Sequence, residues 1–403
     1  MPHYIRIGRT PAKHHIRFPR GNAESYKGEG LHYEHIVTTE GFDRAYSILY
    51  HLKPPTRVKR VELLREWALK AAAPSPLRHH HLKSAGIPRS GDPYTGRVPL
   101  MFNQDMICSR CRPATAMAGG FDFYRNGQFD DIIFVWRGGG WLESSFGRQR
   151  YRMDDYIVIP RGTTYRLVPD DVAQEDYLVL ESSHPVRIPA RYLQPEGQIR
   201  MGAPYSERDF HGPDSLASGE GPAEIWLKRA NHVSRYVLDH HPWDVVGWDG
   251  TIYPVTFNIH DFEPRAGRFH VPPPIHQTFQ ANNVVFCSFV PRKLDWDPEA
   301  IMLPYHHSNL DSDEVLYYVE GNYAARRGIS QGSFTHHVGG LPHGPQPGAL
   351  EASLDRARET DELAVMVDTF RPLHRTAVAR QIFDRDYPFS WHTGGVTGTT
   401  SIA

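Results

Sequence analysis

The sequence has little of the features that would place it in a specialised class. Only three of its 403 residues are cysteines, an odd and low number that excludes a disulfide-dense scaffold. No run of about 18 apolar residues predicts a transmembrane helix. The 45 Lys and Arg residues nearly balance the 46 Asp and Glu residues, which argues against a general nucleic-acid binder. Because the N-terminal residues also lack a signal-peptide pattern, we expect a cytoplasmic protein with no membrane or nucleic-acid partner.

The chain is comparatively rich in turn formers and aromatic residues. It contains 34 Gly, 33 Pro and 12% aromatic residues, a composition that fits many short strands joined by turns. Apolar runs bounded by turn residues predict strands at 131–136, 154–160, 177–181, 223–228, 284–290, 314–319 and 363–370. An apolar spacing near 3.6 predicts one helix over 57–73. We interpret the histidine triplet at 79–81 as part of a solvated turn.

The strand pattern of the first half is repeated after residue 253. We therefore predict a mostly-β fold with two β-sandwich halves and a few short helices. The predicted domains are an N-terminal sandwich with an N-terminal arm over 1–252 and a C-terminal domain over 253–403.

Potential metal ligands are densest between residues 270 and 343. The cluster contains His270, His276, His306, His307, Glu314, His336, His337 and His343. A histidine, a glutamate on the next strand and a later histidine after a proline turn can meet inside a small barrel. Two imidazoles and one carboxylate on one face of a metal leave positions open for an organic substrate and O2, whereas a closed four-ligand zinc site leaves none. The sequence thus predicts a metal centre in the C-terminal domain.

Several of these segments resemble one enzyme family. Residues 304–309, Glu314, 321–323 and 337–345 are similar to the active-site segment of the homogentisate 1,2-dioxygenases, and 145–147, 155–163, 270–275 and 286–292 extend the resemblance. It implies a bicupin, with two jelly-roll halves, that holds Fe(II). The implied reaction is ring cleavage of homogentisate with O2 to maleylacetoacetate, in tyrosine and phenylalanine catabolism. The family also implies a homo-oligomer, either a trimer or a hexamer.

The resemblance assigns a role to individual residues. It implies that the iron ligands are His307, Glu314 and His343, and that His270 is the catalytic residue, which receives the phenolic proton of the substrate. Tyr323, His337 and His343 are then expected in the substrate-binding site, with His337 beside the iron. Six residues separate His307 from Glu314, one more than is usual in the family, so His306 stays an alternative ligand.

Other interpretations of the same residues stay open at this point. A related enzyme could act on another hydroxylated aromatic acid such as gentisate, and a cupin isomerase could use zinc or manganese. A storage or binding bicupin is expected to lack a complete ligand set, so His307, Glu314 and His343 count against it. Cys108 and Cys111 have CxxC spacing, but no second pair completes a zinc site.

Overall fold

The computed structural model describes most of the chain and divides it into two compact units. The described residues are 3–14, 16–21, 30–117, 122–267, 273–295, 297–300, 305–321, 323, 328–354 and 359–392. Unit 1 comprises 1–69, 88–98 and 108–261, and unit 2 comprises 70–87, 99–107 and 262–403. The break after Asp261 lies close to the boundary predicted after residue 252. The assignment of 70–87 and 99–107 to unit 2 had no signal in the sequence.

Unit 1 is built from antiparallel sheets with one parallel pair, β8 with β16. One sheet has the order β1-β18-β3-β2, a second β11-β10-β13-β8-β16-β17-β4, and a third contains β15-β19-β12-β9-β14-β7. The strands are β1 Ile5–Gly8, β2 Tyr33–Thr38, β3 Tyr46–His51, β4 Arg60–Glu66, β7 Met106–Cys111, β8 Phe123–Asn126, β9 Asp130–Arg137, β10 Gly140–Ser144, β11 Gly147–Tyr151, β12 Asp155–Ile159, β13 Thr164–Pro169, β14 Asp176–Ser182, β15 Phe210–His211, β16 Ala223–Arg229, β17 His232–Leu238, β18 Val245–Gly250 and β19 Val255–Asn258.

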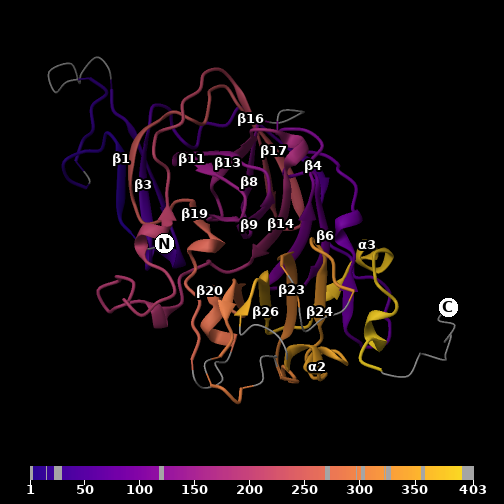
Figure 1. Cartoon of the computed structure of the whole chain (residues 1–403). Coiled ribbons are helices and arrows are strands. Elements are labelled where there is room, and N and C mark those ends of the chain that lie inside the picture. Colours follow the sequence, from indigo (N-terminus) through magenta and orange to yellow (C-terminus); the bar gives the residue numbers. More distant parts are fainter. Residues whose placement is uncertain are drawn as a thin grey trace. The chain divides into compact units, whose positions relative to one another are not determined.

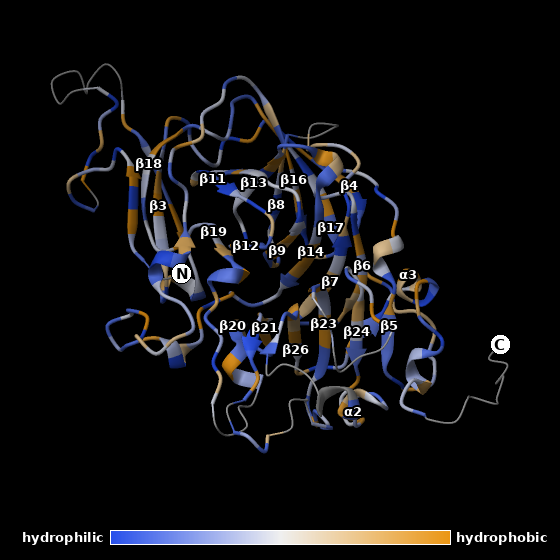
Figure 2. Cartoon of the chain, in the orientation of Figure 1, coloured by the Kyte–Doolittle hydropathy of each residue, from blue (hydrophilic) through white to orange (hydrophobic). Residues whose placement is uncertain are grey.

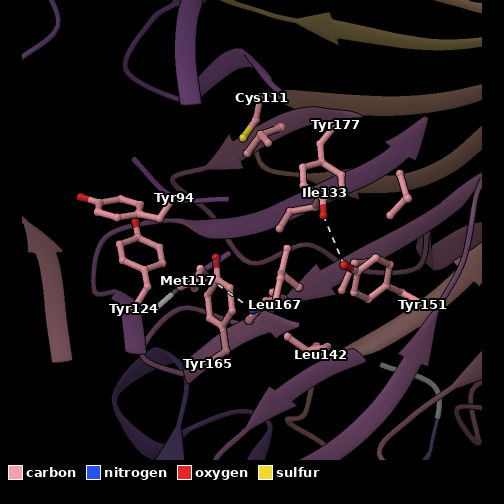
Figure 3. Close-up of a cluster of buried hydrophobic side chains, with 14 residues drawn as sticks. Tyr94, Cys111, Met117, Tyr124, Ile133, Leu142, Tyr151, Tyr165, Leu167 and Tyr177 are labelled. Atoms are coloured by element: carbon pink, nitrogen blue, oxygen red, sulfur yellow. Dashed lines mark hydrogen bonds between the residues drawn. The ribbon is translucent and has the colours of Figure 1, made fainter. Parts of the chain in front are cut away.

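The core of unit 1 lies between the second and third sheets. Figure 3 shows the buried side chains of this core. Tyr124 and Tyr165 belong to the second sheet, and Ile133 and Tyr177 belong to the third. The hydroxyls of Tyr151 and Tyr177 lie 3.2 Å apart, so these buried polar groups satisfy each other. Two sheets packed through such inner faces form a β-sandwich, as predicted for this half.

The helix predicted over 57–73 is wrong. The central residues form strand β4, which pairs antiparallel with β17 at the edge of the second sheet. Val61 and Leu63 produced the helical spacing, but both are exposed. Pairing with a strand far along the chain decided the structure here, and a local apolar period does not report such pairing.

Unit 2 contains one six-stranded antiparallel sheet with the order β20-β21-β26-β23-β24-β5 (Figure 1). Short strand pairs, β22 with β25 and β6 with β27, accompany it. The strands are β5 His80–Leu82, β6 Arg97–Phe102, β20 Gln277–Ala281, β21 Val284–Phe289, β22 Arg292–Lys293, β23 Asp313–Glu320, β24 Phe334–His337, β25 Glu359–Thr360, β26 Leu363–Thr369 and β27 His374–Arg375.

The histidine triplet is not solvated, which corrects the sequence interpretation. His79, His80 and His81 are all buried, and β5 pairs with β24 as the edge strand of the unit 2 sheet. Histidine is a hydrophilic residue on the hydropathy scale. Figure 2 shows that many paired strands carry hydrophilic as well as hydrophobic residues. Both ring nitrogens of His79 and of His81 have hydrogen-bond partners inside the fold, which allows these two polar side chains to be buried.

Helices are few and short in the described part of the chain. The α-helices are α2 Ala349–Leu354 and α3 Ala377–Gln381, and the 3-10 helices are η1 Glu40–Phe42, η2 Ser84–Gly86, η3 Val172–Gln174, η4 Ala190–Tyr192, η5 Glu207–Asp209, η6 Ile259–Asp261, η7 Pro273–His276 and η8 Tyr387–Phe389. None of the described helices is long and apolar enough to cross a membrane.

A network of buried charges lies within unit 1. Lys228 pairs with Glu181, whose Oε1 also accepts from Asn126 at 2.8 Å. Arg97 donates to Asp131 at 3.1 Å and lies 3.6 Å from Glu181. Two cations thus face two carboxylates, which offsets the desolvation cost of each charge.

We expect Lys228→Met to destabilise the protein by about 3–5 kcal/mol, because it leaves Glu181 buried with less compensation. The matched control is Arg57→Met, which breaks an exposed pair with Asp239 and should lower stability far less, because solvent screens exposed ion pairs. Urea unfolding of both variants measures the difference. Equal losses of stability in the two variants would show that the buried ion pair stabilises the protein no more than the exposed one.

Candidate metal centre

The candidate centre begins with three polar side chains in one row across the unit 2 sheet. In the strand register, Glu314 of β23 stands opposite His337 of β24 on one side and Asp368 of β26 on the other. Residues directly opposite in antiparallel strands project from the same face, with Cβ atoms about 4.5–5.5 Å apart. Valine and tyrosine residues along β23 favour the strand that holds this register.

Two histidines reach the same face from loops. The backbones of His307 and His343 form reciprocal hydrogen bonds of 2.8 and 2.9 Å, which make them an isolated pair of antiparallel residues. Their rings consequently lie together, with centroids 4.2 Å apart. One nitrogen or oxygen atom from each of His307, Glu314 and His343 lies within 4.8 Å of the other two.

The ring nitrogens that face the carboxylate suit a metal ion. Nδ1 of His307 donates to the carbonyl of Tyr305 at 3.4 Å, and Nδ1 of His343 to that of Leu341 at 3.5 Å. In the neutral rings, the protons on Nδ1 leave lone pairs on Nε2. These Nε2 atoms lie 3.7 and 3.4 Å from the Glu314 oxygens. Lone pairs that converge on a carboxylate require a cation or protons between them, so the donor set fits a metal.

Glu314 is held in its ionised form. Burial raises the pKa of this carboxyl, but the hydrogen bond from His337 and the imidazoles of His307 and His343, which can carry protons toward it when no metal is bound, outweigh burial and keep the pKa well below its ordinary value. His337 donates from Nδ1 to Glu314 Oε1 at 2.6 Å, and its Nε2 accepts from the Tyr387 hydroxyl at 3.0 Å. This chain orients the carboxylate from behind, as is usual for metal ligands.

His306 and His307 differ in where they point. His306 is exposed and is not part of the three-residue cluster found among the described residues. Its ring lies over Gly344, where an added Cβ would meet it at 2.6 Å. Gly344 therefore has room for no side chain, which explains the Pro-His-Gly order that follows the turn. The geometry favours His307 over His306 as the ligand.

A cavity of about 950 Å³ opens beside the cluster. Its described lining includes the cluster residue His343, together with His306, Tyr305 and Trp391. This volume lies within the range of ligand pockets, about 300–1,000 Å³. The lining also contains Asp295, Glu299 and Glu351 and, among described residues, no Lys or Arg. A cation that holds a substrate carboxylate is therefore absent from this described lining.

Of the other predicted site residues, the structure describes Tyr323 but not His270. Tyr323 is buried, donates to the carbonyl of Leu363 at 3.3 Å and packs against Tyr318. No described contact joins it to the three-residue cluster. Residue His270 lies outside the described residues. His276, from the same histidine-rich segment, is buried against Phe289 with ring centroids 4.4 Å apart.

Sequence reasoning missed Asp368 as a member of the site. A carboxylate near the end of the otherwise apolar β26 was a visible signal, but its place beside Glu314 depends on strand register. Its buried Oδ1 has no hydrogen-bond partner in the described structure. Burial and the neighbouring Glu314 raise the pKa of Asp368 to about 8.

Comparison with known proteins agrees with both halves of the fold. A family model described as "Homogentisate 1,2-dioxygenase N-terminal" matches residues 117–259, and its C-terminal counterpart matches 271–395. The chain belongs to the homogentisate 1,2-dioxygenase family. The predicted mostly-β bicupin is thereby confirmed, and the chain is an enzyme of a dioxygenase family. The candidate centre lies in the region matched by the C-terminal model.

The similar proteins differ in how much of the chain they match. A protein of Saccharolobus solfataricus described as a candidate dioxygenase is 37% identical over 98% of this chain and 100% of its own length. Homogentisate 1,2-dioxygenases of Bradyrhizobium diazoefficiens and Emericella nidulans are each 28% identical, over 65% and 58% of this chain. The matches span 61% and 54% of those two enzymes. The chain therefore spans less than two thirds of the length of these two enzymes.

We predict that Glu314→Gln and His307→Ala each weaken Fe(II) affinity by more than about 100-fold. Loss of a residue that only supports a ligand costs up to about 100-fold, and loss of a ligand itself should cost more. Titration calorimetry without oxygen measures this affinity. His306→Ala is the matched control and should bind the metal as the wild type does. Loss of the metal in His306→Ala with retention in His307→Ala would transfer the ligand role to His306.

We also predict a pH-dependent effect of Asp368→Asn on the metal-free protein. The raised pKa of Asp368 means that the folded chain holds a proton which the unfolded chain has lost, so this carboxyl lowers stability as pH rises from about 4 to about 8. Asparagine removes that penalty. The melting temperature of the variant should match wild type near pH 4 and exceed it near pH 8.

Asp361→Asn, at an exposed carboxyl of the same unit, serves as the control and should show no such divergence. A constant offset between Asp368→Asn and wild type at all pH values would contradict the prediction.

Proposed function

We propose that this chain is an Fe(II)-dependent dioxygenase that opens the ring of homogentisate with O2 to give maleylacetoacetate. The observation that carries the proposal is the convergence of His307, Glu314 and His343 on one face of the unit 2 sheet. Membership of the family adds the reaction class, and the named relatives add the substrate. Two imidazoles and one carboxylate are the ligand set of non-haem Fe(II) oxygenases.

The ligand residues would act through charge and orientation. Glu314 is the anionic member, and His337 holds its Oε1 in place. The carbonyls of Tyr305 and Leu341 keep the two ligand rings in the tautomer that presents Nε2. Bound iron would supply open coordination positions and a redox-active centre for the two reactants.

Proton transfer is assigned on the family resemblance. Removal of the phenolic proton makes the ring electron-rich, and an imidazole with an ordinary pKa of about 6.5 suits that step near neutral pH. We propose His270 as this acceptor, and Tyr323 and His337 as residues that border the substrate. The homo-oligomeric assembly and the cytoplasmic location stay predictions.

A related aromatic acid such as gentisate is the second candidate substrate. The relative that matches 98% of this chain is described without a substrate. Homogentisate and gentisate both carry a carboxylate, so the described cavity lining, with three carboxylates and no Lys or Arg, does not distinguish them. Ring cleavage by the same ligand set would serve either acid, so the two substrates must be compared directly.

Oxygen uptake by the iron-loaded protein tests the proposal. The protein is purified without oxygen, loaded with Fe(II) and mixed with homogentisate or gentisate in oxygen-containing buffer. We expect one O2 consumed per homogentisate, with a new absorbance from the conjugated ring-opened product. Oxygen uptake with gentisate alone would show that gentisate, and not homogentisate, is the substrate. No oxygen uptake with either acid despite bound iron would overturn the proposal.

Two controls isolate the role of the centre. Protein loaded with redox-inactive Zn²⁺ should consume no oxygen, because zinc cannot exchange electrons with the reactants. Glu314→Gln, supplied with the same Fe(II), should lose turnover together with bound iron. Full turnover in Glu314→Gln would show that the reaction occurs elsewhere.

A further inference from the structure

His79 lies against the candidate centre, although it is more than two hundred residues distant in sequence. It directly precedes β5, whose register with β24 pairs His336 with His80. Continuing that register by one residue places His79 opposite His337. The ring of His79 is buried and meets the rings of both His337 and His343 edge-on, with centroid distances of 5.4 Å in each case.

The hydrogen bonds of His79 define its tautomer. The backbone N–H of Val338 donates to Nδ1 at 3.2 Å. A backbone N–H can only donate, so Nδ1 must be the unprotonated nitrogen and Nε2 must carry the proton. Nε2 in turn donates to the carbonyl of Pro342 at 3.1 Å. A neutral ring with one defined tautomer satisfies both groups at once.

These two bonds span the turn that carries a ligand. Val338 directly follows His337, which orients Glu314, and Pro342 directly precedes His343. One ring therefore joins the two ends of the five-residue segment 338–342. With the segment held at both ends, the position of His343 relative to His337 and Glu314 is constrained. His337 and His343 accordingly stack, with centroids 4.2 Å apart and planes 21° apart.

We infer that His79 is a positioning residue of the metal centre: by bridging Val338 and Pro342 it sets the geometry in which His343 meets the metal beside His307 and Glu314. The inference rests on the metal centre of the proposed function. It assigns no contact between His79 and the metal, since His79 acts through the turn.

The test uses Co²⁺, whose visible spectrum reports ligand number and geometry without any turnover. His79→Phe keeps an aromatic ring and removes both hydrogen bonds, whereas His79→Gln keeps one acceptor and one donor. The matched control is His80→Phe in the same triplet, since the ring of His80 packs against His336 and Phe383. All variants are full-length protein.

We expect His79→Phe to weaken Co²⁺ affinity by about 10–100-fold, the usual effect of losing a supporting residue, and to shift the visible bands. His79→Gln should recover part of both, and His80→Phe should leave both unchanged. A folded His79→Phe protein with wild-type affinity and spectrum would overturn the inference while leaving the metal centre intact. Failure of the wild type itself to bind Co²⁺ and Fe(II) would overturn the centre and this inference together.

If His79→Phe does not fold, His79→Gln and His79→Met form the decisive pair. The two side chains are similar in length, but only glutamine has an amide that can replace one of the two hydrogen bonds of His79. Tighter Co²⁺ binding by the glutamine variant supports the bridge. Equal affinity of the two variants contradicts it.

Discussion

A single buried carboxylate sets the requirements for the rest of unit 2. Glu314 has been taken out of water, and an uncompensated carboxylate in that position costs several kcal/mol. Its compensation comes from His337 at 2.6 Å and from the imidazoles of His307 and His343 at 3.7 and 3.4 Å. The β23–β24 register supplies the first imidazole, and a backbone bridge between two loops supplies the other two. The arrangement is complete only when a cation or protons lie between Glu314 and the two loop histidines.

The two units treat buried charge in opposite ways. In unit 1, Arg97 and Lys228 face Asp131 and Glu181, so two cations from the chain itself balance two carboxylates. In the described part of unit 2, Glu314 and Asp368 are neighbours across two strands, and the groups facing Glu314 are imidazoles rather than permanent cations. Asp368, whose pKa is raised to about 8 by burial and by Glu314, is a second carboxyl that ionises here only against the repulsion of Glu314. This difference fits a metal centre in unit 2, where a bound cation would balance Glu314, whereas Arg97 and Lys228 already balance the carboxylates of the unit 1 network.

Prediction from sequence succeeded where structure is locally encoded. The run at 131–136 became β9 and the run at 363–370 became β26, because an apolar stretch bounded by turn residues is a property of the segment itself. The same approach failed at β4, where pairing with β17 outweighed a helix-like spacing. It failed again at the histidine triplet, because burial of a polar segment depends on hydrogen-bond partners that the local sequence does not show.

The site was predictable to a similar extent and for similar reasons. The order of histidines and a glutamate around strands and a proline turn predicted a metal centre, the family resemblance implied His307, Glu314 and His343, and the structure brings these three together. Their supports were not recognisable, because Asp368 joins the row through strand pairing and His79 approaches from a segment far away in sequence. A residue that acts through register or through a backbone bridge has no characteristic spacing from the residues it supports.

The extra residue between His307 and Glu314 does not decide which histidine faces Glu314, because the structure fixes the two residues independently of the loop between them. The number of residues between the histidine and Glu314 left His306 as an alternative ligand. A shift of one residue in the loop changes which of the two histidines lies opposite Glu314. His307, however, is placed by reciprocal backbone bonds to His343, and Glu314 is placed by β23. The intervening residues 308–312 lie outside any strand, and such loops absorb an insertion at little cost. Because His306 packs against Gly344 and His307 is paired with His343, the backbone pairing, and not the number of loop residues, determines which imidazole faces Glu314.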